Sequence, residues 1–154
     1  MMKRKAFTLV EILIAMFLMS VVILSIFLLN QSANKSSMDA YYEMLCFSLA
    51  REPIEIYRGF GYKTANDIID NPELAPKQYP VNAGFVKIES NFEENIRYPE
   101  EAENFERQIT LVHPEGSNYV RIEVRIQPIG TSKADSWMRR NDISLESIIM
   151  EQPK

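Results

Sequence analysis

Residues 6–29 read AFTLVEILIAMFLMSVVILSIFLL, an apolar run in which Glu11 is the only charged residue. No glycine or proline occurs between Ala6 and Glu52, so nothing in the local sequence breaks a helix. A rise of about 1.5 Å per residue makes the run roughly 36 Å long as a helix, more than the ~30 Å hydrocarbon core of a bilayer. Because lipid offers no partners to the backbone, the run predicts a membrane-spanning helix.

The flanks of this run indicate its orientation and its fate. Lys3, Arg4 and Lys5 precede it, and basic residues stay on the cytoplasmic side, so we expect the rest of the chain outside the cytoplasm. A secretory signal peptide has an apolar core of about 7 to 15 residues and a small-x-small cleavage site. The stretch 12–29 is longer, and Gln31 stands where such a site needs a small residue. We therefore expect the helix to be retained.

A plain membrane anchor explains everything in this region except Glu11. A carboxylate at the centre of a spanning helix costs about 2.5 to 3.5 kcal/mol, and less near the membrane surface. Glu11 lies one turn inside the run, where its side chain can reach toward the interface. Taken alone, Glu11 leaves the plain anchor open as an alternative.

The composition of the 154 residues narrows the function. Hydrophobic residues make up 46%, which is enough for one modest core. The net charge is −4 although the leader is basic, so the rest of the chain is distinctly acidic and no nucleic-acid partner is expected. One cysteine and one histidine supply neither an internal disulfide nor a transition-metal cluster, and we expect no cofactor and no metal.

A short basic leader, Ala6, the sequence FTLVE at 7–11 and a long apolar helix follow one another. This string resembles the amino terminus of type IV prepilins and of the pseudopilins of type II secretion systems. In that family a prepilin peptidase at the inner membrane cuts before the Phe and methylates the new amino group. The resemblance implies cleavage between Ala6 and Phe7, N-methylation of Phe7, and Glu11 as the fifth residue of the mature chain. The family usually has Gly before the cut, where this chain has Ala6.

The resemblance also implies partners and an assembly role. The partners are prepilin peptidase, other pilin or pseudopilin subunits and, indirectly, an assembly platform protein and an ATPase. The new amine at Phe7 is cationic at neutral pH. At about 4 Å and an effective dielectric constant of ~20, it attracts the Glu11 carboxylate of an adjacent subunit by about 4 kcal/mol before desolvation. One such pair selects one stagger between apolar helices that otherwise slide. Thr8 is expected to pack between helices or to be neutral filler.

Beyond the exit from lipid at 30–37 the helical pattern continues. Five apolar residues at helical spacing form a stripe: Met38, Tyr42, Leu45, Leu49 and Ile56. We predict a single helix over 7–57, which Pro53 bends or ends and which Gly59 and Gly61 stop. The proline-rich stretch 60–80 is then predicted to be a loop with one helical turn at 65–69.

Strand patterns dominate the remainder of the chain. They occur at 84–90, 107–113, 119–127 and 143–150. The third is the clearest, because Val, Ile, Val and Ile alternate with polar residues from Val120 onward. A glycine-containing turn joins the second and third segments and predicts a hairpin. The expected fold is α+β: a long amino-terminal helix, membrane-spanning in its first half, packed against a small antiparallel β-sheet head.

Three features of the head are candidates for function. The acidic segment 100–106 is expected to be solvated or to contact the basic segment 133–140 of a neighbour. His113 is expected at the surface, without the Ser or Asp partners that a general base needs. Cys46 is expected to be a small buried hydrophobe rather than a reactive thiol.

The sequence therefore predicts three regions: a cleaved leader at 1–6, a transmembrane and filament-core helix at 7–29, and a periplasmic or extracellular head at 30–154. The expected function is a structural subunit of a type IV pilus or related filament. Major type IVa pilins usually close a carboxy-terminal loop with two cysteines. This chain has only Cys46, so we favour a minor pilin. A type II secretion pseudopilin and a single-pass anchored binding protein remain alternatives. An enzyme is not expected. The protein should first reside in the inner membrane with its amino terminus in the cytoplasm.

Overall fold

The computed structural model describes residues 8–93, 96–130 and 142–152. It divides the chain into two compact units, Met1–Tyr41 and Tyr42–Lys154, and the second unit is called the head below. The predicted cleavage positions Ala6 and Phe7 and the basic segment 133–140 lie outside the described residues.

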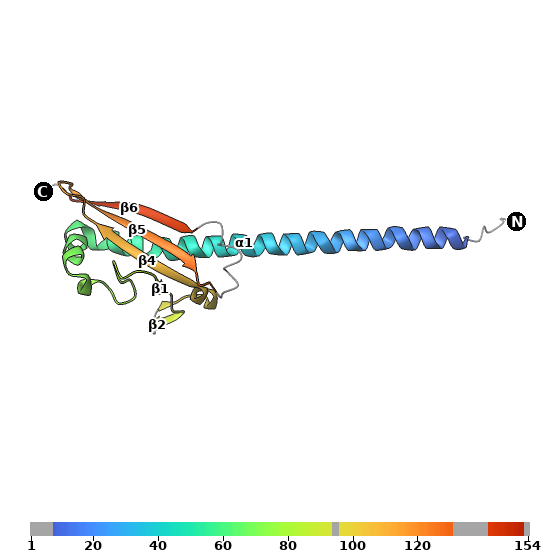
Figure 1. The fold of residues 1–154 in the computed structure, drawn as a ribbon, viewed down its shortest axis with the longest axis horizontal. Coiled ribbons are helices and arrows are strands. Elements are labelled where there is room, and N and C mark those ends of the chain that lie inside the picture. The colour runs from blue at the N-terminus through green and yellow to red at the C-terminus, as the bar shows by residue number, and fades with distance from the viewer. Residues whose placement is uncertain (1–7, 94–95, 131–141, 153–154) are drawn as a thin grey trace. The chain divides into compact units, whose positions relative to one another are not determined.

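One long helix, α1, spans Leu9–Asp70 (Figure 1). The helix continues past the predicted end at Tyr57 and the loop predicted from residue 60 is wrong, but the predicted interruption at Gly61 is confirmed. Helical residues continue past Gly59, and the non-helical residue inside α1 is Gly61, with φ 78° and ψ 171°. Glycine adopts this region without steric cost, so Gly61 kinks the helix and a second helical segment follows. The helical turn predicted at 65–69 lies in that segment.

Pro53 lies inside α1 without ending it, and the reason is found in the sheet. A proline lacks the N–H that would bond the carbonyl four residues earlier, here that of Leu49. Arg107 supplies the missing donor: its Nη1 lies 3.1 Å from the Leu49 oxygen. The prediction that Pro53 would bend or end the helix considered only local backbone bonding, and a side chain 58 residues from Leu49 replaces that bond.

The head contains a four-stranded antiparallel sheet in the order β1-β4-β5-β6. Its strands are β1 (Val86–Lys87), β4 (Phe105–Val112), β5 (Tyr119–Pro128) and β6 (Ile143–Met150). The hairpin β4–β5 and the strand at 143–150 are confirmed. The strand predicted at 84–90 shrinks to β1, because the chain leaves the sheet after Ile88 and Ser90 accepts a hydrogen bond from the N–H of Tyr98 instead.

The remaining elements connect β1 to β4 and α1 to β1. A two-stranded sheet pairs β2 (Asn91–Glu93) with β3 (Ile96–Arg97). Two 3₁₀ helices are η1 (Pro72–Leu74) and η2 (Glu100–Asn104). The acidic residues predicted to be loop therefore lie largely on η2, directly before β4.

The core of the head lies between the sheet and the part of α1 that begins at Tyr42 (Figure 1). The predicted apolar face of β5 is confirmed, since Val120, Ile122, Val124 and Ile126 are fully buried. The rings of Tyr42 and Phe105 meet edge to face with centroids 6.0 Å apart. Met38 does not extend this buried stripe, because its side chain is 49% exposed. The α+β architecture, a long apolar helix and a small antiparallel sheet, is confirmed.

Candidate functional site

The start of α1 places Thr8 and Glu11 in contact. The backbone N–H of Thr8 donates to Glu11 Oε2 at 3.3 Å, and the N–H of Glu11 donates to Thr8 Oγ1 at the same distance. The Thr8 hydroxyl also lies 3.4 Å from Oε2. These reciprocal bonds form a capping box, in which each side chain satisfies a backbone donor that the first helical turn leaves free.

The capping box directs the Glu11 carboxylate toward the amino end of the helix. That end carries the partial positive charge of the helix dipole, which favours an anion there. Both Thr8 contacts go to Oε2, and Oε1 makes no hydrogen bond to any residue between 8 and 152 that the structure describes. The carboxylate therefore has free acceptor capacity close to the position where a processed chain would begin.

Thr8 was expected to be a packing residue or neutral filler, and its role as the helix cap was missed. The signal was present in the sequence as Thr-x-x-Glu before an apolar run. Glu11 thus has a local role at the start of the helix beside the assembly role predicted from its charge. The two roles are compatible, since a carboxylate offers about four lone-pair directions.

The surface of α1 behind the cap is apolar on every side. All of the large hydrophobic residues from Leu9 to Leu29 are exposed, by 46% to 75%. The polar side chains among them bond within the helix: Ser20 Oγ donates to the carbonyl of Phe17 at 2.7 Å, and Ser25 Oγ to that of Val21 at 2.8 Å. By length and composition α1 is able to cross a membrane. A helix that is apolar all round needs lipid or other helices around it.

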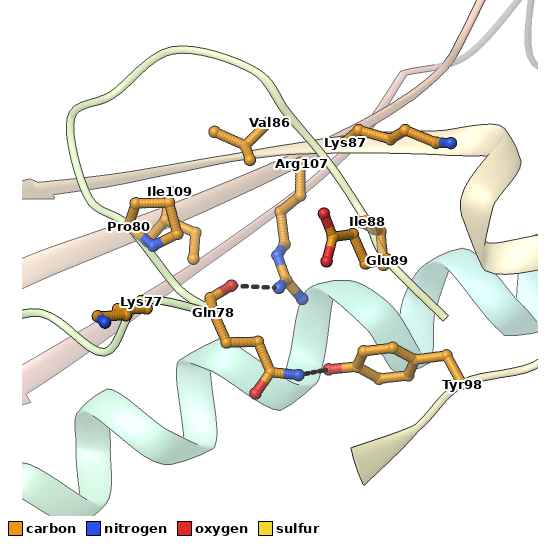
Figure 2. Close-up of a pocket in the computed structure, with 10 residues that line it drawn as sticks. All are labelled: Lys77, Gln78, Pro80, Val86, Lys87, Ile88, Glu89, Tyr98, Arg107 and Ile109. Carbon is orange, nitrogen blue, oxygen red and sulfur yellow. Dashed lines mark hydrogen bonds between the residues drawn. The ribbon is translucent and has the colours of Figure 1, made fainter. Parts of the chain in front are cut away.

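A polar cluster in the head connects Gln78, Tyr79 and Tyr98 to α1 and β4. Arg107, only 6% exposed, donates from Nη2 to the carbonyl of Gln78 at 3.2 Å (Figure 2). Its guanidinium also lies over the ring of Tyr79, 4.7 Å from the ring centroid. Tyr98 donates to Glu52 Oε2 at 2.6 Å and accepts from Gln78 Nε2 at 3.0 Å. These bonds connect α1, β4 and the segment between them.

Burial shapes the acid–base behaviour of this cluster. It raises the pKa of the Tyr98 hydroxyl, and the hydrogen bond to the Glu52 carboxylate raises it further. It likewise raises the pKa of Tyr57 and of Tyr79 above the usual tyrosine range. These hydroxyls are therefore neutral hydrogen-bonding groups at physiological pH.

The other side chains weighed for chemistry occupy structural positions. Burial raises the pKa of the Cys46 thiol to about 12, so the thiolate that reacts is scarce at neutral pH, and the expectation of a buried hydrophobe is confirmed. His113 is half-buried rather than at the surface as predicted, because its ring packs 6.0 Å from that of Tyr62. Within the described residues no group of three or more His, Cys, Asp or Glu is placed to hold a metal ion.

Comparison with known proteins identifies the amino-terminal region. Residues 1–27 match the family described as the prokaryotic N-terminal methylation motif, which is the signal of type IV pilins and pseudopilins. No curated protein and no solved structure matches the chain. The chain therefore carries the amino-terminal signal of a type IV pilin-like or pseudopilin protein, and this signal implies processing by prepilin peptidase and assembly with other pilins.

Proposed function

We propose that the chain is a minor pilin, a structural subunit of a type IV pilus or a related filament. The leader 1–6 of the precursor faces the cytoplasm. Prepilin peptidase removes it and methylates the new amino group of Phe7. The segment 7–29 holds the protein in the inner membrane and later forms the filament core. Residues 30–154 form the head outside the cytoplasm.

The observation that carries this proposal is the combination of an all-round apolar helix surface with one carboxylate held at its amino end. The exposed residues of 9–29 have no partner surface among the described residues of the chain, so lipid or neighbouring subunits must cover them. The methylation motif covers the same segment. A segment of this kind can leave the bilayer without exposing apolar surface if helices of other subunits replace the acyl chains.

Glu11 gives this exchange a register. Its Oε2 is used by Thr8, and its Oε1 remains available for the methylated amine of an incoming subunit. Breaking an ion pair in apolar surroundings leaves an unpaired buried charge, which costs free energy. The axial stagger that forms the pair is therefore favoured over other staggers. An ATPase acting through the assembly platform supplies the work of extraction from the membrane.

The register role and the capping role of Glu11 can be separated by two substitutions. Glu11→Gln keeps a side-chain oxygen for the capping box but removes the charge, because glutamine also serves at this position. Thr8→Ala removes the cap and keeps the charge. We expect Glu11→Gln to be cleaved and membrane-bound normally but to be incorporated into sheared filaments at least tenfold less than wild type, and Thr8→Ala to be only mildly reduced.

Normal incorporation of Glu11→Gln would refute the register role. Mass spectrometry of the mature amino terminus tests the processing step, and an intact hexapeptide in the assembled form would refute the whole proposal. A pseudopilin would show the same processed terminus, but its filaments would remain in the periplasm instead of reaching the cell surface.

A further inference from the structure

The two edges of the head sheet differ in sequence and are complementary. We propose that they join neighbouring copies of this chain, with β6 of one copy pairing antiparallel to β1 of the next. The contact adds a head-to-head link to the proposed filament, and it relies on that proposed function only for the common orientation of the copies.

β6 is an edge strand without the usual protection against pairing. All eight of its residues pair with β5 in unbroken register, and its other side is an edge of the described sheet. Natural edge strands are commonly blunted by lysine, proline or a bulge. β6 has the sequence ISLESIIM, with Glu146 as its one charge, and Ile148 and Met150 are 55% and 65% exposed. Such a strand is a template for another chain.

β1 forms the opposite edge, and it is short and partly apolar. Phe85 and Val86 are each 39% exposed. A hollow of about 70 Å³ borders both β1 and its partner β4. It is lined by Val86, Lys87 and Ile88, by Arg107 and Ile109, and by residues of the segment 77–80 (Figure 2).

The strand directions allow the two edges to meet when copies share one orientation. Each neighbouring pair in β1-β4-β5-β6 is antiparallel, so β1 and β6 run in opposite directions. Moving a copy sideways across its sheet places its β1 beside β6 of the first copy as an antiparallel neighbour. This contact uses two different surfaces, and contacts of that kind extend into rings or helical filaments.

Charge selects the register of this pairing. Glu146 faces Glu123 across the β5–β6 pair, and like charges in directly opposed positions are destabilising. Glu123 is already bonded to Arg125, whereas Glu146 makes no ion pair with any residue in the described segments. Lys87 lies opposite Glu106, its side chain is 57% exposed, and its Nζ lies 3.7 Å from Glu103 Oε2 of the same copy. Because an exposed pair of this kind is weak, Lys87 of the next copy can also pair with Glu146.

The register that opposes Lys87 and Glu146 also matches the remaining exposed residues. Antiparallel counting then places Phe85 opposite Ile148, so that two exposed apolar side chains meet. Val86 lies opposite Ser147. One register thus forms an ion pair and an apolar contact together.

A symmetric pairing of β6 with β6 is the competing arrangement. It would reverse the direction of the head part of α1 between the two copies, while filament subunits drawn from one membrane run in parallel. It would also leave β1 unused and bring no cation to Glu146. We therefore assign the β6 edge to β1 of a neighbouring copy.

Cysteine cross-linking in the full-length protein in its native membranes and filaments tests the pairing. The variant Val86→Cys/Ser147→Cys carries one thiol on each edge at opposed positions, and both substitutions are close in size to the originals. Mild oxidation should give a ladder of dimers, trimers and longer products on non-reducing gels. Each single substitution should give no ladder, and Val86→Cys/Met150→Cys, with its second thiol three residues along and on the other face, should give at least fivefold less product.

Charge variants in the same double-cysteine background test the register. Lys87→Glu should reduce the ladder severalfold, and adding Glu146→Lys should restore it. No ladder from Val86→Cys/Ser147→Cys would overturn the inference, as would dimers from Ser147→Cys alone, which would indicate β6–β6 pairing. Filaments without a ladder would refute the edge contact and leave the proposed function intact, whereas a ladder in membranes without filaments would do the reverse.

Discussion

The two parts of α1 differ in apolar content and have opposite surroundings. From Leu9 to Leu29 every large apolar side chain is exposed, whereas from Tyr42 onward the apolar residues on one face are buried against the sheet. The difference appears in the spacing: one apolar stripe suffices where the helix packs on its own chain, and apolar residues on all sides are needed where the surroundings are apolar. The head thus has its apolar contacts within the chain, whereas the large apolar side chains of 9–29 are exposed.

The largest predicted loss of stability tests this comparison with two phenylalanines, one in the head and one in the amino-terminal part of α1. Phe105 is fully buried in the head and Phe17 is 67% exposed on α1. Phe105→Ala should lower the unfolding free energy of the head by about 3 to 5 kcal/mol, through lost burial and the cavity left behind. The measurement is denaturant unfolding of the full-length protein in detergent, followed by near-ultraviolet circular dichroism. Phe17→Ala is the control and should change it by less than about 0.5 kcal/mol. Equal effects would mean that Phe17 is packed as tightly as Phe105, which would contradict its exposure.

A smaller effect should follow from the bond between the sheet and the proline in α1. Arg107→Met removes the donor to the Leu49 carbonyl, which Pro53 leaves without its usual partner. Leaving this buried carbonyl unpaired should lower stability by about 1 to 3 kcal/mol. In a Pro53→Ala background the helix supplies its own N–H, so the same substitution should be milder. A double-mutant cycle in thermal unfolding measures the difference. Strict additivity would show that Arg107 does not compensate for Pro53.

The head should also lose stability in alkali, where the tyrosine cluster ionises. Burial raises the pKa of Tyr57, Tyr79 and Tyr98 in the folded head above the value of about 10 in the unfolded chain. A raised folded pKa gives stability that is complete below the unfolded value and is lost as pH rises through the folded one. The unfolding free energy should therefore fall steadily above about pH 10. Tyr98→Phe should be less stable at neutral pH and show a shallower alkaline decline, and an unchanged slope would exclude Tyr98 from the effect.

The smallest effect is expected on the solvent-facing side of α1 within the head. Arg51 Nε lies 3.5 Å from Glu55 Oε1, one turn away, with side chains 76% and 50% exposed. Exposed pairs of this spacing contribute about 0.3 to 0.5 kcal/mol and are screened by salt. Arg51→Ala should lower head stability by no more than this, and by less in high salt. A loss above about 1 kcal/mol would show that this face of α1 is packed rather than solvated.

Much of the head could be read from local spacing. The alternation from Val120 onward predicts one buried face, and the strand at 143–150 has the bounds predicted for it, because a side-chain period of two depends only on neighbouring residues. The capping box at Thr8 was readable in the same way and was missed. The assembly role of Glu11 stays a prediction, because its proposed partner belongs to another molecule.

The failures concern bonds between distant residues. Pro53 does not end the helix, although its missing N–H is visible in the sequence, because the guanidinium of Arg107 bonds the Leu49 carbonyl once the sheet has docked. The first predicted strand shortened because Ser90 bonds Tyr98, eight residues later, in place of extending the sheet. Neither partner is marked by any periodic pattern.

The sequence by itself determined an apolar membrane-spanning segment with a methylation motif, a helix that continues beyond it, and the faces and bounds of the main strands. Each of these follows from hydrophobicity and period over a few consecutive residues. The tertiary structure alone decided how the proline of α1 is tolerated, where the first predicted strand ends, and which edges the sheet exposes. These depend on which distant backbone groups find hydrogen-bond partners once the core has formed, and no local pattern encodes that.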